Sequence, residues 1–134
     1  MAGSSKKKRA ALYNRIREDW HRVKDHPPCL QQCHILKEVC LLSSEPLLLL
    51  RDPIEEGAEF SIGKGRQYGH QALEIATGLG ALNEIGEICC FLAEHYKNIA
   101  EFEKALSYCA AALEIGAKTG NLFTIDLAHR RKDE

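Results

Sequence analysis

Long apolar segments are missing from this sequence. The longest uninterrupted apolar run, residues 46–50, is far shorter than the about 20 apolar residues of a membrane-spanning helix. The N-terminus is basic and lacks the apolar region of a signal peptide, and Ala2 excludes N-myristoylation. We therefore expect no membrane partner and a location in the cytoplasm or the nucleus.

Features of nucleic-acid-binding proteins are also missing. Aromatic residues make up only 7% of the chain, they suggest no base-stacking platform, and no zinc-finger spacing occurs. The formal net charge is −1 at pH 7, and basic residues cluster only at positions 6–9. Such a cluster can be read by a nuclear import receptor or touch an acidic surface, although a solvated, frayed terminus is commoner. We assign residues 1–9 to a flexible basic N-terminus and expect no nucleic-acid partner.

Six cysteines without a secretory signal are expected to be reduced thiols. Cys29, Cys33 and Cys40 fall on one face of an expected helix, and His26 and His34 are close in sequence. A structural zinc site, however, usually takes ligand pairs from separate segments, and cysteines on an apolar face usually pack into a core. Nothing in the sequence predicts an environment that stabilises a thiolate. We therefore expect no metal, no cofactor and no catalytic residue, and hence not an enzyme.

An internal repeat organises the second half of the chain. Residues 72–75 (Ala-Leu-Glu-Ile) return as residues 112–115, 40 positions later. The same register aligns further pairs of identical residues, namely Lys64 with Lys104, Tyr68 with Tyr108, Gly80 with Gly120, Leu82 with Leu122 and Ile85 with Ile125. A fixed period of this length is typical of a solenoid, in which each unit buries its apolar face on its neighbour.

Two helices are predicted between the copies, within residues 85–96 and 102–113. Apolar residues recur there at steps of three and four, as a helix with one buried face requires. Asn98 tolerates the left-handed conformation that ends a helix. These features predict an all-α fold of antiparallel helical hairpins, and a third copy begins at residues 121–128.

Residues 10–60 are predicted to form an N-terminal helical segment. An amphipathic helix is expected from about residue 5 to 23, and a second one at residues 29–42, after His26-Pro27-Pro28. Asp52-Pro53 is typical of a helix start, so a short helix is expected to follow it and end near residues 57–60. The helix at 61–78 would then belong to an earlier repeat. We expect the first helix of that repeat within residues 42–57, interrupted by Pro46 and Pro53.

The hairpin resembles the tetratricopeptide repeat (TPR) family. Leu92-Ala93, Tyr96 and Ala105 stand at TPR pattern positions, whereas Cys89, Cys109 and Ala117 depart from the pattern. The period of 40 is longer than the usual 34 and resembles the repeats of the Pins/LGN spindle-orientation proteins and the kinesin light chains. The resemblance covers residues 61–128 and implies a short TPR-like α-solenoid. Another helical repeat or a plain bundle is the alternative.

The resemblance implies a non-catalytic adaptor that binds a peptide or helix of a partner protein. In TPR proteins the first helix of each hairpin lines the binding groove. The positions that this implies here are Glu87, Cys90, Glu94, Lys97 and Asn98; a solvated helix face is the simpler interpretation of the same residues.

The alternative function is a structural or regulatory fragment that docks into a larger assembly through an exposed helical edge. The repeat pattern stops within the third copy, and residues 129–134 form a charged C-terminal end. We therefore expect a shortened form of a longer TPR protein, with an apolar edge that self-associates or recruits further helices.

Overall fold

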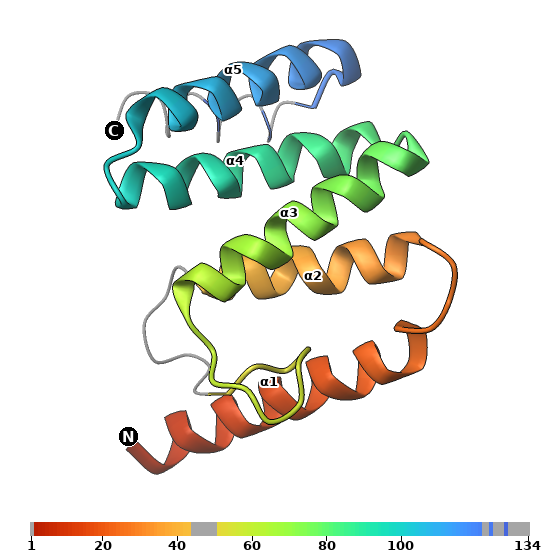
Figure 1. The fold of residues 1–134 in the computed structure, drawn as a ribbon, viewed down its shortest axis with the longest axis vertical. Coiled ribbons are helices and arrows are strands. Elements are labelled where there is room, and N and C mark those ends of the chain that lie inside the picture. Colours follow the sequence, from red (N-terminus) through yellow and green to blue (C-terminus); the bar gives the residue numbers. More distant parts are fainter. Residues whose placement is uncertain (1, 44–50, 122–123, 125–127, 129–134) are drawn as a thin grey trace.

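The computed structural model describes residues 2–43, 51–121, 124 and 128. Within these residues the chain forms five α-helices, α1 (Ala2–Val23), α2 (Leu30–Leu42), α3 (Ile62–Leu79), α4 (Leu82–Asn98) and α5 (Phe102–Thr119). The helices follow one another from one end of the molecule to the other (Figure 1). Thr124 and Ala128 are also helical. The all-α prediction is confirmed.

The helices pair as two antiparallel hairpins. α2 packs on α3, and α4 packs on α5. The two hairpins contact each other mainly through α3 and α4. α2 also touches α4, so the first helices of the two hairpins lie beside one another. α1 contacts α2 at the end of the stack.

The 40-residue period is a structural repeat of the second helices. α3 and α5 have bounds that differ by 40 at both ends, and they end at Gly80 and Gly120 in left-handed conformations with φ of 68° and 69°. Glycine is favoured there because it has no Cβ to clash. Between α4 and α5 the residue with positive φ is Ala100, at 61°, rather than the predicted Asn98.

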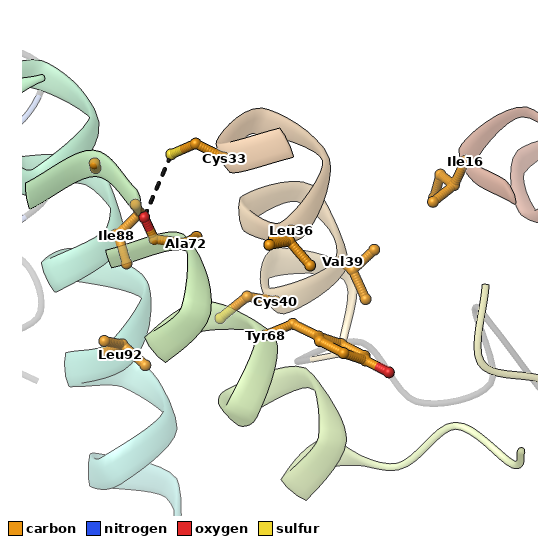
Figure 2. Packing of buried hydrophobic residues seen from close by; sticks show 10 residues of the cluster. Ile16, Cys33, Leu36, Val39, Cys40, Tyr68, Ala72, Ile88 and Leu92 are labelled. Atoms are coloured by element: carbon orange, nitrogen blue, oxygen red, sulfur yellow. Dashed lines mark hydrogen bonds between the residues drawn. The ribbon is translucent and has the colours of Figure 1, made fainter. Parts of the chain in front are cut away.

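The main core lies between the two hairpins. Figure 2 shows Leu36 and Val39 of α2 beside Tyr68 and Ala72 of α3, with Leu92 of α4 on the other side. These side chains are at most 5% exposed. Full burial of a leucine or valine side chain stabilises the folded state by about 1.5–3 kcal/mol relative to leaving it exposed. This apolar packing fixes the helix faces that remain at the surface.

The N-terminal segment differs in two respects from its prediction. α1 already begins at Ala2, so the basic residues 6–9 lie within a helix. The first helix paired with α3 is α2 rather than a helix within residues 42–57. Residues 44–50 of that expected helix lie outside the described residues.

Residues 51–60 form a turn instead of the short helix expected after Asp52-Pro53. The Asp52 carboxylate accepts hydrogen bonds from the amides of Ile54 and Glu55 at 2.8 and 3.0 Å, as an N-cap would. Arg51 and Glu59, however, form an isolated β-bridge that turns the chain back. The Tyr68 hydroxyl donates to the other oxygen of Asp52 at 2.5 Å. The capping hydrogen bonds predicted for Asp52 are therefore present, but they stabilise a turn and not the start of a helix.

Candidate functional site

The surface formed by α2 and α4 is the candidate site, here called the α2–α4 face. On each helix the residues of this face recur at steps of three and four, which places them on one side. They are Leu30, His34, Lys37, Glu38 and Leu41 of α2, and Glu84, Glu87, Phe91, Glu94 and Asn98 of α4. None of them is fully buried. The face therefore combines charged groups with accessible apolar side chains.

Lys37 joins the two helices of the face. Its Nζ donates hydrogen bonds to Glu84 Oε2 at 2.8 Å and to Glu87 Oε2 at 2.7 Å. His34 Nε2 lies 3.1 Å from the same oxygen of Glu84. The Lys37 side chain is only 17% exposed, so these interactions are partly shielded from water. One lysine thus holds two carboxylates of the facing helix.

The electrostatics of this group follow from burial and charge pairing. Burial of Lys37 opposes its positive charge, but the hydrogen bonds to Glu84 and Glu87 outweigh burial and raise its pKa. Burial of Glu84 favours its neutral form, but Lys37 and His34 outweigh burial and lower its pKa. Lys37 and Glu84 therefore stay ionised at neutral pH.

The α4 part of the face is acidic. Glu84, Glu87 and Glu94 lie along it, and Lys37 is the lysine that α2 supplies to the face. Glu38 of α2 pairs with Arg15 of α1, and Arg15 Nη1 lies 3.5 Å from Glu38 Oε2. Exposed Leu30 and Leu41, 44% and 41% accessible, lie at the two ends of α2. The face offers a negative charge excess bordered by apolar contacts.

A hollow of about 310 Å³ continues this face between α1 and α2. Val23 and Ile35 contribute apolar contacts, and Asp19 and Glu38 contribute carboxylates. His34 lies at the border, since it lines the hollow and also contacts Glu84. The hollow therefore extends the accessible surface beyond the two hairpins.

Of the five residues predicted from the TPR resemblance, Cys90 is buried and the other four are at least partly accessible. Glu87, Glu94 and Asn98 are separated by seven and four residues, so they share the α2–α4 face. Glu87 is engaged by Lys37, Glu94 is half-buried, and Asn98 is exposed at the end of α4. Lys97 is three residues from Glu94 and half-buried, so it lies beside the same face, whereas Cys90 is buried.

Cys90 is in the interior and not on a groove surface. Its exposure is 0%, and its Sγ donates to the carbonyl oxygen of Thr124 at 3.8 Å. Cys89, Ala112 and Ala128 form the same buried cluster. The groove position predicted for Cys90 is wrong because Thr124 and Ala128 cover that side of α4.

The buried cysteines are poorly suited to nucleophilic chemistry. Burial raises the pKa of Cys33 to about 11, that of Cys40 to about 12 and that of Cys89 to about 11. These thiols are therefore protonated at neutral pH, whereas the thiolate is the reactive form. Among the described residues, no group of three or more His, Cys, Asp or Glu side chains is placed to hold a metal ion.

The residues of the candidate site that the sequence prediction missed are His34, Lys37 and Glu84. The spacing of Glu84 and Glu87 predicts that they share a helix face, and Lys37 and His34 likewise share a face. Nothing in the sequence shows that the two pairs meet, because that depends on the packing of α2 beside α4.

Comparison with protein-family models, with curated proteins and with solved structures found no match. Among the described residues, no helix has the length and apolar character needed to cross a membrane. The geometry and charge of the α2–α4 face are therefore the features of the described residues that bear on function.

Proposed function

We propose that the protein is a non-catalytic adaptor of the TPR type, which binds a peptide or helix of a partner protein on the α2–α4 face. The observation that carries the proposal is the placement of the first helices of the two hairpins side by side, with their accessible faces joined through Lys37. This is the arrangement by which the first helices of a TPR array line a groove. The α2–α4 face is also the surface on which charged and apolar side chains are interspersed.

The charge of the face favours a partner segment with basic and apolar residues. Glu87 and Glu94 would attract lysine or arginine side chains, and Leu30 and Leu41 would contact apolar ones. An acidic tail would be repelled by the same carboxylates. The proposal therefore excludes the two-carboxylate clamp that some TPR domains use for chaperone C-terminal peptides.

Selection of peptides from a displayed random library tests this proposal. The wild-type protein should enrich peptides with Lys or Arg next to apolar residues, and a Glu87→Lys/Glu94→Lys variant should not retain them. The matched control is Glu74→Lys/Glu114→Lys, which makes the same charge change at exposed, repeat-equivalent positions of α3 and α5. The control should retain the wild-type peptides.

Two results would contradict the proposal. Enrichment of acidic peptides by the wild-type protein would show that the face does not select by its negative charge. Equal loss of binding in the α4 variant and in the control would show that overall charge matters rather than this face. Binding of selected peptides should be measured with purified protein by calorimetry at two salt concentrations, because an electrostatic contribution weakens with salt.

A second candidate is docking into a larger assembly through an apolar edge. Ile99, Phe102 and Leu106 are 45%, 59% and 51% exposed around the start of α5. Clustered exposed apolar side chains favour association. Light scattering over a concentration series tests self-association: growth of mass with concentration, lost in Phe102→Ser/Leu106→Ser, supports it, and a constant monomer mass contradicts it.

A further inference from the structure

A cluster of aromatic and basic side chains lies on the opposite side of α4 from the proposed partner surface. Tyr96 is two residues from both Glu94 and Asn98, which places it about 200° around the helix from each. Its ring stacks on that of Tyr108 of α5, with centroids 5.6 Å apart and an interplanar angle of 3°. His70 of α3 meets both rings edge-on at 6.0 and 6.1 Å. Three helices thus converge on one aromatic centre.

Two cationic groups surround the same ring. The Arg66 guanidinium carbon lies 5.7 Å from the centroid of Tyr96, and Lys104 Nζ lies 5.3 Å from it. Arg66, His70, Tyr96 and Tyr108 are half-buried, and Lys104 is exposed. The cluster is therefore accessible from solvent, while most of its groups are held by packing.

Arg66 and Lys104 bring two positive charges to the cluster. The pKa of His70 is lowered first by burial and then by Arg66, Lys104 and His95, all of them basic groups. His70 Nε2 and the Tyr96 hydroxyl share a hydrogen bond of 2.7 Å. Glu101 lies 3.4 Å from Lys104, but both side chains of that pair are largely exposed, so water and salt screen it.

We propose that Arg66, His70, Tyr96, Lys104 and Tyr108 form a binding site for a phosphate group. The planar guanidinium of Arg66 can donate two parallel hydrogen bonds to phosphate oxygens, and Lys104 adds a second positive charge. When His70 Nε2 is protonated it donates to the Tyr96 oxygen, which leaves the Tyr96 hydroxyl as a further donor, and the Tyr108 hydroxyl can add another. A tetrahedral dianion uses this many donors better than a carboxylate does. The site is independent of the α2–α4 face, because the two surfaces share no residue.

Nuclear magnetic resonance titration of the full chain with inorganic phosphate tests the site. At constant ionic strength, amide signals of α3, the end of α4 and the start of α5 should shift and reach saturation. The apparent pKa of His70 should rise when phosphate is added, because a bound anion stabilises the imidazolium. A second titration uses a phosphoserine peptide. Tighter binding than inorganic phosphate would identify a phosphorylated partner as the source, and equal binding would identify the free ion.

Matched variants distinguish this site from general charge effects. Arg66→Gln/Lys104→Gln should weaken phosphate binding at least tenfold, whereas Arg22→Gln/Lys118→Gln, with the same change of charge at exposed positions, should leave it unchanged. Lys104→Gln alone alters only an exposed side chain, so it tests the site even if the Arg66 change impairs folding. Shifts that never saturate, equal losses in both double variants, or tighter binding of an acidic peptide without phosphate would overturn the proposal.

Discussion

The two hairpins share the register of their second helices but differ in how closely their helices approach. In α3, Gly65 and Gly69 stand where α5 has Ala105 and Cys109. A Cβ at Gly65 would lie 2.1 Å from Ser43 Cβ, and one at Gly69 would lie 2.6 Å from Cys40 Sγ. The α2–α3 contact is therefore too close for a side chain, whereas α4 and α5 accommodate Ala105 and Cys109 in a buried contact. The glycines of α3 lower its helix propensity, but they allow α3 to pack closely against α2.

The hairpins also differ in what covers the equivalent tyrosines. Residues 43–61 connect α2 with α3, and the turn within this connection places Asp52 on the hydroxyl of Tyr68. Only residues 99–101 connect α4 with α5, and Tyr108 packs on Tyr96 and His70 instead. The tyrosine at this repeat position therefore makes a buried hydrogen bond in the first hairpin, as Tyr68, and belongs to an accessible aromatic cluster in the second, as Tyr108. A repeat in sequence conserves helix position more strongly than it conserves the environment of each residue.

The largest effect is expected where the approach is closest. Gly65→Ala should lower the free energy of unfolding by about 3 kcal/mol, because rotation of Ser43 cannot relieve a clash with its Cβ and the helices must separate. Gly78→Ala is the control, since nothing lies within 4 Å of a Cβ there, and it should stabilise α3 by up to about 1 kcal/mol. Urea unfolding measures both. A stabilising Gly65→Ala would show that α2 and α3 are further apart than described.

The equivalent tyrosines should respond differently to loss of their hydroxyl. Tyr68→Phe leaves the buried Asp52 with one hydrogen bond fewer, so we expect a loss of about 1–3 kcal/mol. Tyr108→Phe keeps the ring contacts of a half-buried residue and should change stability by less than about 0.5 kcal/mol. Thermal and urea unfolding of the two variants gives this comparison directly. Equal losses would mean that the two environments do not differ as described.

The junction between the hairpins should make stability depend on pH. His95 Nε2 lies 3.0 Å from both Ser43 Oγ and the Cys40 carbonyl oxygen, and burial is the main cause that lowers its pKa. The unfolded chain binds a proton at this histidine near pH 6.5 while the folded protein does not. The stability that depends on neutral His95 is therefore full above about pH 7 and falls as the pH drops toward 5.5, by at most about 1.4 kcal/mol per pH unit for this one group. Burial also lowers the pKa of His70, so His70 adds to the fall in the same direction.

Two variants test the assignment of this pH dependence to His95. His95→Gln should reduce the change in stability between pH 7 and 5.5, leaving the part that His70 contributes, although it lowers stability overall. His21→Gln, at an exposed position of α1, should keep the wild-type slope. An unchanged slope in His95→Gln would assign the effect to other groups.

The smallest effect is expected on the α2–α4 face. Lys37→Met should lower stability by about 1 kcal/mol, because Glu84 and Glu87 lose their shared partner and repel each other. Lys118→Met is the control: its pair with Glu114 is 3.4 Å long with both side chains about two-thirds exposed, so its loss should be barely measurable. Equal effects in the two variants would show that Lys37 does not couple α2 to α4. High salt should reduce the difference.

The sequence determined the secondary structure well where helix signals were local. The spacing of apolar residues predicted helices within 85–96 and 102–113, and both are present and longer, as α4 and α5. The helices predicted at 29–42, after the two prolines, and at 61–78, from the repeat, are present within one residue at each end. The 40-residue register anticipated the matching bounds of α3 and α5, because the two sequences carry the same buried positions. Gly80 and Gly120 marked the ends of both helices, since a left-handed residue without a Cβ is a local requirement.

Only the tertiary structure decided which helix pairs with α3 and which helix faces stay accessible. The partner of α3 is α2. The connection between them contains a turn where the capping pattern predicted a short helix, because Asp52 accepts a hydrogen bond from Tyr68 of α3 and Arg51 pairs with Glu59 across the turn. From the sequence, Cys90 was predicted to lie on an accessible side of α4, but Thr124 and Ala128 bury it. Lys37 and Glu84 meet although they are 47 residues apart, and no pattern along one helix can encode that contact. Burial and charge pairing depend on the packing of several helices at once, whereas helix formation depends mainly on neighbours along the chain.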